Sequence, residues 1–575
     1  MPQTLEQILS DWTRSAFTRT FPDTDLSSVQ LDVAVTTEDG YGDYQCNAAM
    51  GLARILKQAP RAIAQAVVEQ NPPPDSIERI EIAGPGFINL HVNPGWLNGH
   101  LEGMAADRTR LGVPAVGAGR TVVLDYSAPN IAKQMHVGHI RSTVIGNALD
   151  RMHRFLGWNV ISDNHVGDWG TQFGVLILGY RHLLDEAALA SDPVTELERI
   201  YVASYARAKE DDAWMDRARG ELVKLQQGDP DNRAIWDRFL ELSRGEFDSI
   251  YERLGVTFDL TRGESYYNDR LSGLLDRMQA AGIAVESEGA LVVHLEEEKL
   301  PVCIVRKSDG AANYATTDLA TIESRVEEFD PVAIVYVTDE RQQTHFRQVF
   351  AVARRMAITT RFDHVWYGLM RLPEGTFSSR EGNVIKLHAL LDEAEARALV
   401  LVQESRTEMA DEQQRDVARA VGIGAVKYAD LSQNPQSLVT FSWDKALALD
   451  GNSAPYLQYA YARIASVRDK YAERFPGQDL DERPIRLGEP VEVKLGLLLA
   501  RFPEAVMRAA QQYKPNLLAD YLYELAQTYS RFYQNVPFLK AEDGVRESRV
   551  RVCGLVARTL REGLHLLGIE TPERI

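Results

Sequence analysis

Residues 121–157 read TVVLDYSAPNIAKQMHVGHIRSTVIGNALDRMHRFLG and predict a strand that leads into a helix. The first six are apolar and β-branched at their start, which is typical of a buried strand, whereas the later apolar residues recur at helical spacing. Pro129 disfavours helix at the residue before it, so we expect the helix to begin near Met135 or His136. The loop between them then lies over the carboxyl end of the strand, where open α/β sheets bind ligands.

Two histidines stand at the expected start of this helix. His136 and His139 are three residues apart and share one helical face, and the free N–H groups of a helix start attract phosphate. Gly138 between them removes a side chain that a flat base would strike. The arrangement suits a nucleoside triphosphate, although two histidines in such a place are often only capping or surface residues.

The string SAPNIAKQMHVGH resembles the HIGH region of class I aminoacyl-tRNA synthetases. Together with NHVGDWGTQFG at 164–174 it resembles arginyl-tRNA synthetases of the bacterial type in particular. The resemblance implies an α/β fold: a Rossmann-type catalytic domain, an N-terminal α/β domain that touches tRNA, and a C-terminal all-helical anticodon-binding domain. We expect these domains at 114–445, 1–113 and 446–575, with an insertion in the catalytic domain at about 180–305.

Composition is compatible with this interpretation. A chain of 575 residues exceeds what one hydrophobic core serves, and 45% hydrophobic with 25% charged residues is ordinary for a globular protein. The net charge of −19 would by itself argue against RNA, but local basic patches allow a large acidic enzyme to bind it. Cys46, Cys303 and Cys553 are far apart, which argues against disulfides and a zinc ribbon and suggests buried thiols. Without a long apolar run or a basic leader, we expect a cytoplasmic protein that does not span a membrane.

The resemblance implies a two-step reaction. L-arginine and ATP would give arginyl-adenylate and pyrophosphate, and the arginyl group would pass to the 3'-terminal adenosine of tRNA-Arg. ATP would carry Mg²⁺ held mainly by its phosphates and water. Neither zinc nor an organic cofactor is expected, and we expect a monomer.

The ATP site predicted from the resemblance combines two segments. His136, His139 and Lys133 would contact the phosphates, and Gly138 would lie under the adenine. The phosphate loop of the class should be FSSREG at 377–382, which lacks the usual lysines but supplies Ser379 and Arg380. Arg380 is predicted to be catalytic together with both histidines and Lys133. The second phosphate cation stays open between Lys133, Arg380 and Lys386.

For arginine, the resemblance places Ser127 and Asn130 near the α-amino and carboxylate groups. The predicted side-chain pocket consists of Asp125, Tyr314, Asp318 and Gln342. Two carboxylates that face one guanidinium would reject lysine, whose ammonium cannot satisfy a planar fork. Two alternatives stay open: Asp125 as an end-of-strand structural residue, and Asp318 as an ordinary charge at a helix start.

The predicted tRNA-binding residues lie near both ends of the chain. Phe87 and Asn89 lie two apart on an expected strand, so they face one way, and an aromatic beside an amide suits stacking on an unpaired base. Phe87 could equally be core and Asn89 a turn cap. The expected helical tail contributes Tyr456, Gln458 and Tyr459, although an aromatic stripe at helical spacing is more often core.

Two other functions compete. Small nucleotidyltransferases that build cofactors also carry HxGH, but they lack a large helical C-terminal domain. A tRNA-binding relative without catalytic activity would account for the altered FSSREG loop, but it need not keep HVGH, Asn130, Tyr314 and Asp318.

Overall fold

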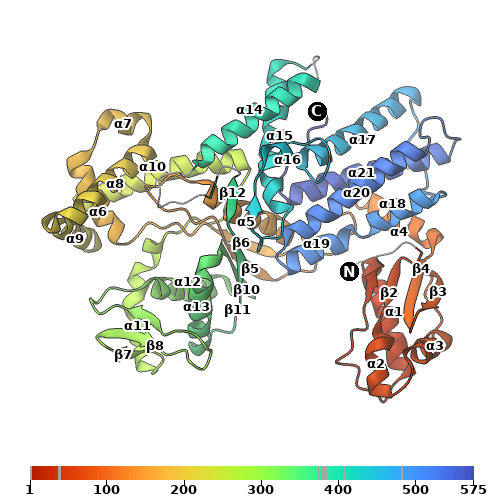
Figure 1. The fold of residues 1–575 in the computed structure, drawn as a ribbon, viewed down its shortest axis with the longest axis horizontal. Helices are drawn as coiled ribbons and strands as arrows, with labels where there is room; N and C mark the ends of the chain where they lie inside the picture. The colour runs from red at the N-terminus through yellow and green to blue at the C-terminus, as the bar shows by residue number, and fades with distance from the viewer. Residues whose placement is uncertain (1–2, 37–39, 373–374, 377–384, 406–408, 481–482) are drawn as a thin grey trace. The chain divides into compact units, whose positions relative to one another are not determined.

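The computed structural model describes residues 3–36, 40–372, 375–376, 385–405, 409–480 and 483–575. These residues fall into two compact units. The first consists of Met1–Val116, Leu449–Leu566 and Glu570–Ile575, and the second of Gly117–Ala448 and Leu567–Ile569. In Figure 1 the colours run from red at the N-terminus to blue at the C-terminus, so the first unit contains both ends of that scale.

The second unit is built on a four-stranded parallel sheet with the order β11-β10-β5-β6. The strands are β5 (Thr121–Asp125), β6 (Asn159–Asp163), β10 (Ala333–Asp339) and β11 (Arg361–Tyr367). β5 and β10 are almost continuously apolar because helices cover both faces of such a sheet. The predicted strand–helix unit is confirmed: β5 is followed by α5 (Val137–Phe155), whose N-cap is His136.

Two further helices flank the sheet, α12 (Tyr314–Phe329) and α13 (Gln343–Arg355). They pack against one another and share a hydrophobic core with β10 (Figure 1). The short 3-10 helix η2 (Glu340–Gln342) joins β10 to α13. α12 therefore begins at the same edge of the sheet at which β10 ends.

The segment between β6 and α12, which contains the range 180–305 predicted as an insertion, is mostly helical. It comprises α6 (Thr171–Leu183), α7 (Glu186–Ser191), α8 (Pro193–Glu210), α9 (Asp212–Gln226), α10 (Pro230–Leu254), the 3-10 helix η1 (Glu264–Arg270) and α11 (Leu271–Ala280). Antiparallel strands β7 (Val285–Ser287), β8 (Ala290–Val293) and β9 (Cys303–Arg306) follow. β7 is short and exposed, so it gives no apolar signal in the sequence.

The end of the second unit is tied to α5 by a buried cation. This last part of the second unit comprises β12 (Met370–Leu372), β13 (Gly375–Thr376), α14 (Leu387–Ser405), α15 (Asp411–Leu431), β14 (Val439–Thr440) and α16 (Trp443–Ala446). Arg141 of α5 donates from Nε to Asp430 Oδ1 at 2.9 Å and from Nη1 to the carbonyl of Gly368 at 2.7 Å. Removing one partner of such a buried pair leaves an uncompensated charge, so this contact fixes α5 against α15.

The first unit contains an antiparallel sheet and a helical part. Its N-terminal elements are α1 (Leu5–Thr20), β1 (Val33–Val35), β2 (Tyr44–Cys46), α2 (Ala48–Leu56), α3 (Pro60–Gln70), β3 (Ile77–Ala83), β4 (Phe87–Val92) and α4 (Pro94–Ala106). The helical part has α17 (Ala454–Arg474), α18 (Pro490–Ala500), α19 (Phe502–Gln511), α20 (Pro515–Asn535) and α21 (Val545–Leu566). α4 packs against α18, and Glu504 of α19 accepts from the backbone N–H of Glu6 at 2.9 Å.

Two expectations from composition can be compared with the fold. Cys46, Cys303 and Cys553 are buried free thiols, as predicted. Within the described part of the chain, no helix is both long enough and apolar enough to span a membrane.

Candidate functional site

The two histidines of HVGH form a reciprocal cap at the start of α5. The backbone N–H of Gly138 donates to Nδ1 of His136 at 3.0 Å, and the backbone N–H of His136 donates to Nδ1 of His139 at 3.0 Å. The ring centroids are 4.0 Å apart. Because each Nδ1 accepts a hydrogen, the neutral rings carry their proton on Nε2. The capping and the phosphate-binding interpretations therefore do not exclude each other, since the caps leave both Nε2–H donors available.

Both rings are uncharged in the folded protein. Burial, followed by Lys133 and Arg341, lowers the pKa of His136. Burial, with a further contribution from His136, lowers the pKa of His139 to about 3. These side chains can serve phosphate as N–H donors near neutral pH, so the positive charge that a triphosphate needs must come from other residues.

The contribution of His139 to stability should fall as the pH drops below about 6.5. In the unfolded chain His139 takes up a proton near its ordinary value of 6.5, whereas in the folded protein its pKa is about 3. The unfolded state therefore binds more protons between these values, and stability present at neutral pH is lost on acidification. His139→Gln should make the fall less steep, by at most about 1.4 kcal/mol per pH unit. Urea unfolding of both proteins across this range measures the difference, and equal slopes would contradict it.

The presence of glycine at position 138 has a local structural explanation. A Cβ atom placed there would lie 2.7 Å from Cε1 of His136 and 2.8 Å from its Nδ1. The first group that a side chain at this position would strike is therefore the capping ring. The predicted contact with an adenine stays a prediction.

Two lysines lie next to the histidines in sequence or in space. Lys133 is half-buried, with Nζ 5.4 Å from the ring centroid of Tyr201. Lys386 is exposed and forms an antiparallel bridge with His136. The backbone N–H of Val137 donates to the carbonyl of Ile385 at 3.1 Å, which places the segment after FSSREG beside HVGH. Ser379 and Arg380 lie outside the described residues.

The predicted arginine-binding residues of α12 lie at its exposed start. Tyr314 is 67% exposed, and the carboxylate of Asp318 is half-buried. Oδ2 of Asp318 lies 2.5 Å from Nε2 of His345, on α13. Gln342 ends η2 and is exposed. α12 and α13 thus bring these residues to one edge of the sheet.

The loop after β5 is held by contacts within the unit. The hydroxyl of Ser127 is buried and lies 2.8 Å from both Thr143 Oγ1 and Tyr251 OH. Ser127 has a φ of +75°, a strained backbone conformation for a residue with a side chain. Asn130 is exposed and forms a parallel bridge with Gly167. Asn130 is thus open to a ligand, whereas the contacts of Ser127 favour a role in holding the loop.

Asp125 is already bound by a guanidinium of the protein. Nη2 of Arg325 donates to Asp125 Oδ2 at 2.7 Å and to Asp163 Oδ2 at 2.8 Å, and all three side chains are buried. Burial raises the pKa of Asp125, and Arg325 opposes that rise. These contacts favour the structural alternative for Asp125 over direct contact with a substrate.

Sequence reasoning missed one carboxylate, Glu264 at the start of η1. Burial, followed by the negative charges of Asp318 and Asp168, raises its pKa to about 8. Asp168 is itself held by the backbone N–H and the hydroxyl of Ser265, at 2.8 and 2.6 Å. A cation bound near both carboxyl groups would favour the ionised form of Glu264. No local signal marked Glu264, because it lies in a polar insertion with many solvated charges.

The predicted tRNA contacts of the N-terminal sheet differ in exposure. Asn89 is fully buried, and its Oδ1 accepts from Nε2 of Gln45 at 2.8 Å. This burial favours a structural role for Asn89, although as part of the sheet rather than as a turn cap. Phe87 begins β4 and is half-buried. Its predicted contact with a base stays a prediction.

The three predicted tRNA-binding residues on α17 also differ in exposure. Gln458 is fully buried, and its Nε2 donates to the carbonyl of Glu570 at 2.7 Å, which fastens the C-terminal segment. Tyr459 is 40% exposed, with the guanidinium of Arg463 5.0 Å from its ring centroid. Tyr456 is half-buried and packs edge-on against Tyr523. Tyr459 and Tyr456 are therefore better placed to meet a partner than Gln458.

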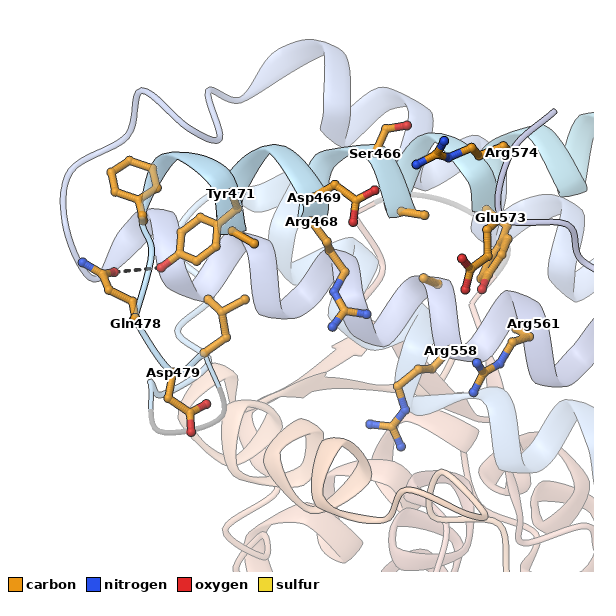
Figure 2. A pocket seen from close by; sticks show the side chains of 17 residues that line it. Ser466, Arg468, Asp469, Tyr471, Gln478, Asp479, Arg558, Arg561, Glu573 and Arg574 are labelled. Carbon is orange, nitrogen blue, oxygen red and sulfur yellow. Dashed lines mark hydrogen bonds between the residues drawn. The ribbon is translucent and has the colours of Figure 1, made fainter. Parts of the chain in front are cut away.

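A pocket of about 510 Å³ lies in the helical part of the first unit, between α17, α21 and the C-terminal segment (Figure 2). It shares no residue with the predicted sites. Arg468, Arg558, Arg561 and Arg574 line it together with Asp469, Asp479 and Glu573. Arg558 also donates to the carbonyls of Ala105 and Asp107, both at 2.7 Å. The mixed charges do not select one class of ligand.

Comparison with known protein families covers nearly the whole chain. Residues 103–443 match the family described as tRNA synthetases class I (R), catalytic domain. Residues 3–92 match the arginyl tRNA synthetase N terminal domain, and residues 457–575 match the DALR anticodon binding domain. The predicted fold class, an α/β synthetase domain between an N-terminal α/β domain and a helical C-terminal domain, is confirmed.

Similar proteins and solved structures agree with the matches to these family models. The chain is 42% identical over 550 residues to the arginine–tRNA ligase of Fusobacterium nucleatum, covering 96% of each chain, and 44% identical over 563 residues to that of Azotobacter vinelandii, covering 95% of each. The crystal structure of arginyl-tRNA synthetase from Plasmodium falciparum superimposes with a TM-score of 0.84 at 26% identity, over 100% of both chains. The arginyl-tRNA synthetase of Thermus thermophilus, which is 24% identical, shares the fold. Its structure superimposes with a TM-score of 0.80 over 99% of this chain and 100% of that one. The chain therefore belongs to the class I aminoacyl-tRNA synthetases, within the arginyl-tRNA synthetase family.

Proposed function

We propose that this protein ligates L-arginine to tRNA-Arg in two steps. In the first, the carboxylate of arginine attacks the α-phosphorus of ATP in line and expels pyrophosphate. In the second, a hydroxyl of the 3'-terminal adenosine of tRNA takes the arginyl group from the adenylate, and AMP leaves. The match of residues 103–443 to the class I (R) catalytic domain carries the proposal, and the HVGH cap, which presents two Nε2–H donors at the carboxyl end of β5, supports its ATP-dependent step.

Catalysis in this proposal is positioning and charge stabilisation, because no protein nucleophile is needed. His136 and His139 donate Nε2–H groups to the phosphates as charge moves onto the departing pyrophosphate. Lys133 supplies a positive charge, and Lys386, beside His136, is a candidate for the second. We retain Ser379 and Arg380 as ATP-binding residues and Gly138 as the position under the adenine. ATP enters as its Mg²⁺ complex, the metal being held largely by phosphates and water.

Asp318 is the main receptor for the guanidinium, with Glu264 as a second carboxylate. Burial raises the pKa of Glu264, and the negative charge of Asp318 adds to the rise, so a cation bound near both groups would favour the ionised form of Glu264. Tyr314 would lie along the aliphatic stem, and Gln342 would complete the polar contacts. Asn130 would bind the α-amino or carboxylate group. Ser127 and Asp125 act indirectly in this scheme, by holding the loop and the strand end on which Asn130 depends.

Binding of tRNA would involve both parts of the first unit. Tyr456 and Tyr459 are proposed to stack on bases near the anticodon, with Arg463 adding positive charge beside Tyr459. Phe87 is proposed to contact the outer corner of the tRNA, while Asn89 and Gln458 shape these surfaces from within. We keep the limits 1–113, 114–445 and 446–575 for the three domains, and we propose a cytoplasmic monomer.

Aminoacylation with separate amino acids on unfractionated tRNA is the direct test. We expect labelled arginine to be esterified to tRNA, and lysine and glutamate to stay below about one hundredth of its rate. Arginine-dependent pyrophosphate exchange without tRNA should be much slower than with it. Charging of lysine or glutamate at a comparable rate would overturn the proposal. Binding of tRNA without any charging would favour a relative that has lost catalysis.

A further inference from the structure

A buried arginine spans the ends of the central strands. Asp125 of β5 pairs directly with Asp163 of β6, and Tyr336 of β10 pairs directly with Asp125. Directly paired residues of neighbouring parallel strands project on the same face, so these side chains lie in a row. Arg325 of α12 lies over this row: Nη2 donates to both carboxylates, and its guanidinium carbon is 5.5 Å from the ring centroid of Tyr336.

Arg325 and the proposed substrate receptor belong to one face of one helix. Asp318 and Arg325 are seven residues apart, which is close to two turns, and Tyr314 lies one turn before Asp318. The start of α12 is held by the contact between Asp318 and His345 on α13. Its deeper part is held to β5 and β6 through Arg325. The position of the Asp318 carboxylate relative to the strand ends therefore depends on the length of the Arg325 side chain.

The surroundings of Arg325 are polar but incompletely paired. Among the described residues, Nε and Nη1 of Arg325, Oδ1 of Asp163 and the hydroxyl of Tyr336 are buried without a hydrogen bond of good geometry, although the hydroxyl of Tyr336 interacts with Arg325. Buried polar groups of this kind are costly and are normally either satisfied or replaced by apolar residues. A role in stability alone would be served as well by apolar packing, which favours a role that needs this charge arrangement.

We propose that Arg325 is a positioning residue for amino-acid recognition: by bridging Asp125 and Asp163 it sets the place of Asp318 and Tyr314 over the strand ends. It also occupies Asp125, so that the guanidinium of the substrate meets Asp318 and Glu264 instead. This inference rests on the proposed function, because it assumes that Asp318 receives the arginine side chain. Arg325 itself touches neither substrate in this scheme.

The test is Arg325→Lys, assayed by pyrophosphate exchange in the presence of tRNA and by thermal unfolding. Lysine keeps the positive charge but is one bond shorter, so either the bridge breaks or α12 moves toward the strands. We expect the KM for arginine to rise about tenfold or more, since a displacement of roughly 1 Å at a binding group has large effects. The KM for ATP should stay within about twofold. A fall in Tm with both KM values unchanged would overturn the inference.

Arg141→Lys is the matched control. Arg141 is as buried as Arg325, lies in the same unit and also bridges an aspartate, Asp430, but it is not on α12. It should lower Tm without raising the KM for arginine selectively. If Arg325→Lys does not fold, Asp163→Asn removes one of the two bridged charges instead. It should raise the KM for arginine by less but in the same direction, and an unchanged KM would overturn the inference.

A double-mutant cycle separates this inference from the proposed function. If Arg325 acts through Asp318, the combined variant Arg325→Lys with Asp318→Asn should lose less than the sum of the two single losses. If Asp318→Asn alone leaves the KM for arginine unchanged, the proposed pocket is wrong whatever Arg325 does. If Asp318→Asn raises it and Arg325→Lys does not, only the role of Arg325 fails.

Discussion

Replacement of Asp318 by asparagine should lower kcat/KM for arginine by about 10²- to 10³-fold, mainly through KM. Removing one partner of a hydrogen-bonded charge pair that is buried in the complex typically costs about 2 to 5 kcal/mol, an interval that includes this range. Asparagine has the same shape as aspartate, so the change removes the charge and leaves the volume unchanged. The KM for ATP should change by less than about threefold, because in the proposed scheme the phosphates are bound at α5 rather than at α12. Steady-state pyrophosphate exchange in the presence of tRNA measures both constants.

Glu328 offers a control on the same helix. Its carboxylate forms an ion pair with Arg262, at 2.5 Å from Oε2 to Nη1, near the other end of α12. Glu328→Gln removes a charge of the same sign from the same element, at a distance from the proposed pocket. Both KM values should stay within about twofold, since ion pairs near the surface contribute little. Equal effects of the two substitutions would indicate that Asp318 acts only through the general field of α12.

Local sequence determined the elements that present the site. The change from a β-branched run to helical spacing predicted β5 and α5, and the structure places the helix start one residue after His136. The alternative that Asp318 is a charge at a helix start agrees with its place near the start of α12. These features depend on residues that are neighbours in sequence, so hydrophobic period and capping chemistry suffice to predict them.

Contacts between distant residues could not be predicted in the same way. Arg325 is separated from Asp125 and Asp163 by 200 and 162 residues, so its pairing depends on how the sheet is assembled. In sequence Arg325 is one of many charges on a polar helix, and such charges usually face solvent. Glu264 was missed for the same reason.

Local sequence patterns also do not predict whether a polar side chain is buried. Asn89 and Gln458 occupy positions that suit contact with RNA, yet both are fully buried. Their partners, Gln45 and the carbonyl of Glu570, lie 44 and 112 residues away. Whether an amide faces solvent is thus decided by residues outside any local window, and base contact is better proposed for the exposed Tyr459.

His139→Ala should reduce the rate of adenylate formation by about 10²- to 10³-fold with little change in the KM for arginine. Loss of one preorganised donor to developing negative charge has effects of this size, and they appear in kcat rather than in binding. The substitution also removes the acceptor for the backbone N–H of His136, so the neighbouring ring loses its support. Single-turnover formation of the adenylate, with tRNA present, isolates this step.

The pH dependence tests the form in which the ring acts. If His139 acted as a cation, activity would fall as the pH rose through about 6.5, the ordinary value for histidine. Because its pKa in the folded protein is about 3, the neutral ring is the form that donates, and the rate should show no such decrease between about pH 6 and 8. His153, also on α5, with Nδ1 2.7 Å from the carbonyl of Leu149, provides the control: His153→Gln should leave the step within about threefold of the parent rate. A loss in His139→Ala no larger than this, or an inflection near pH 6.5 that disappears in the variant, would contradict a neutral N–H donor.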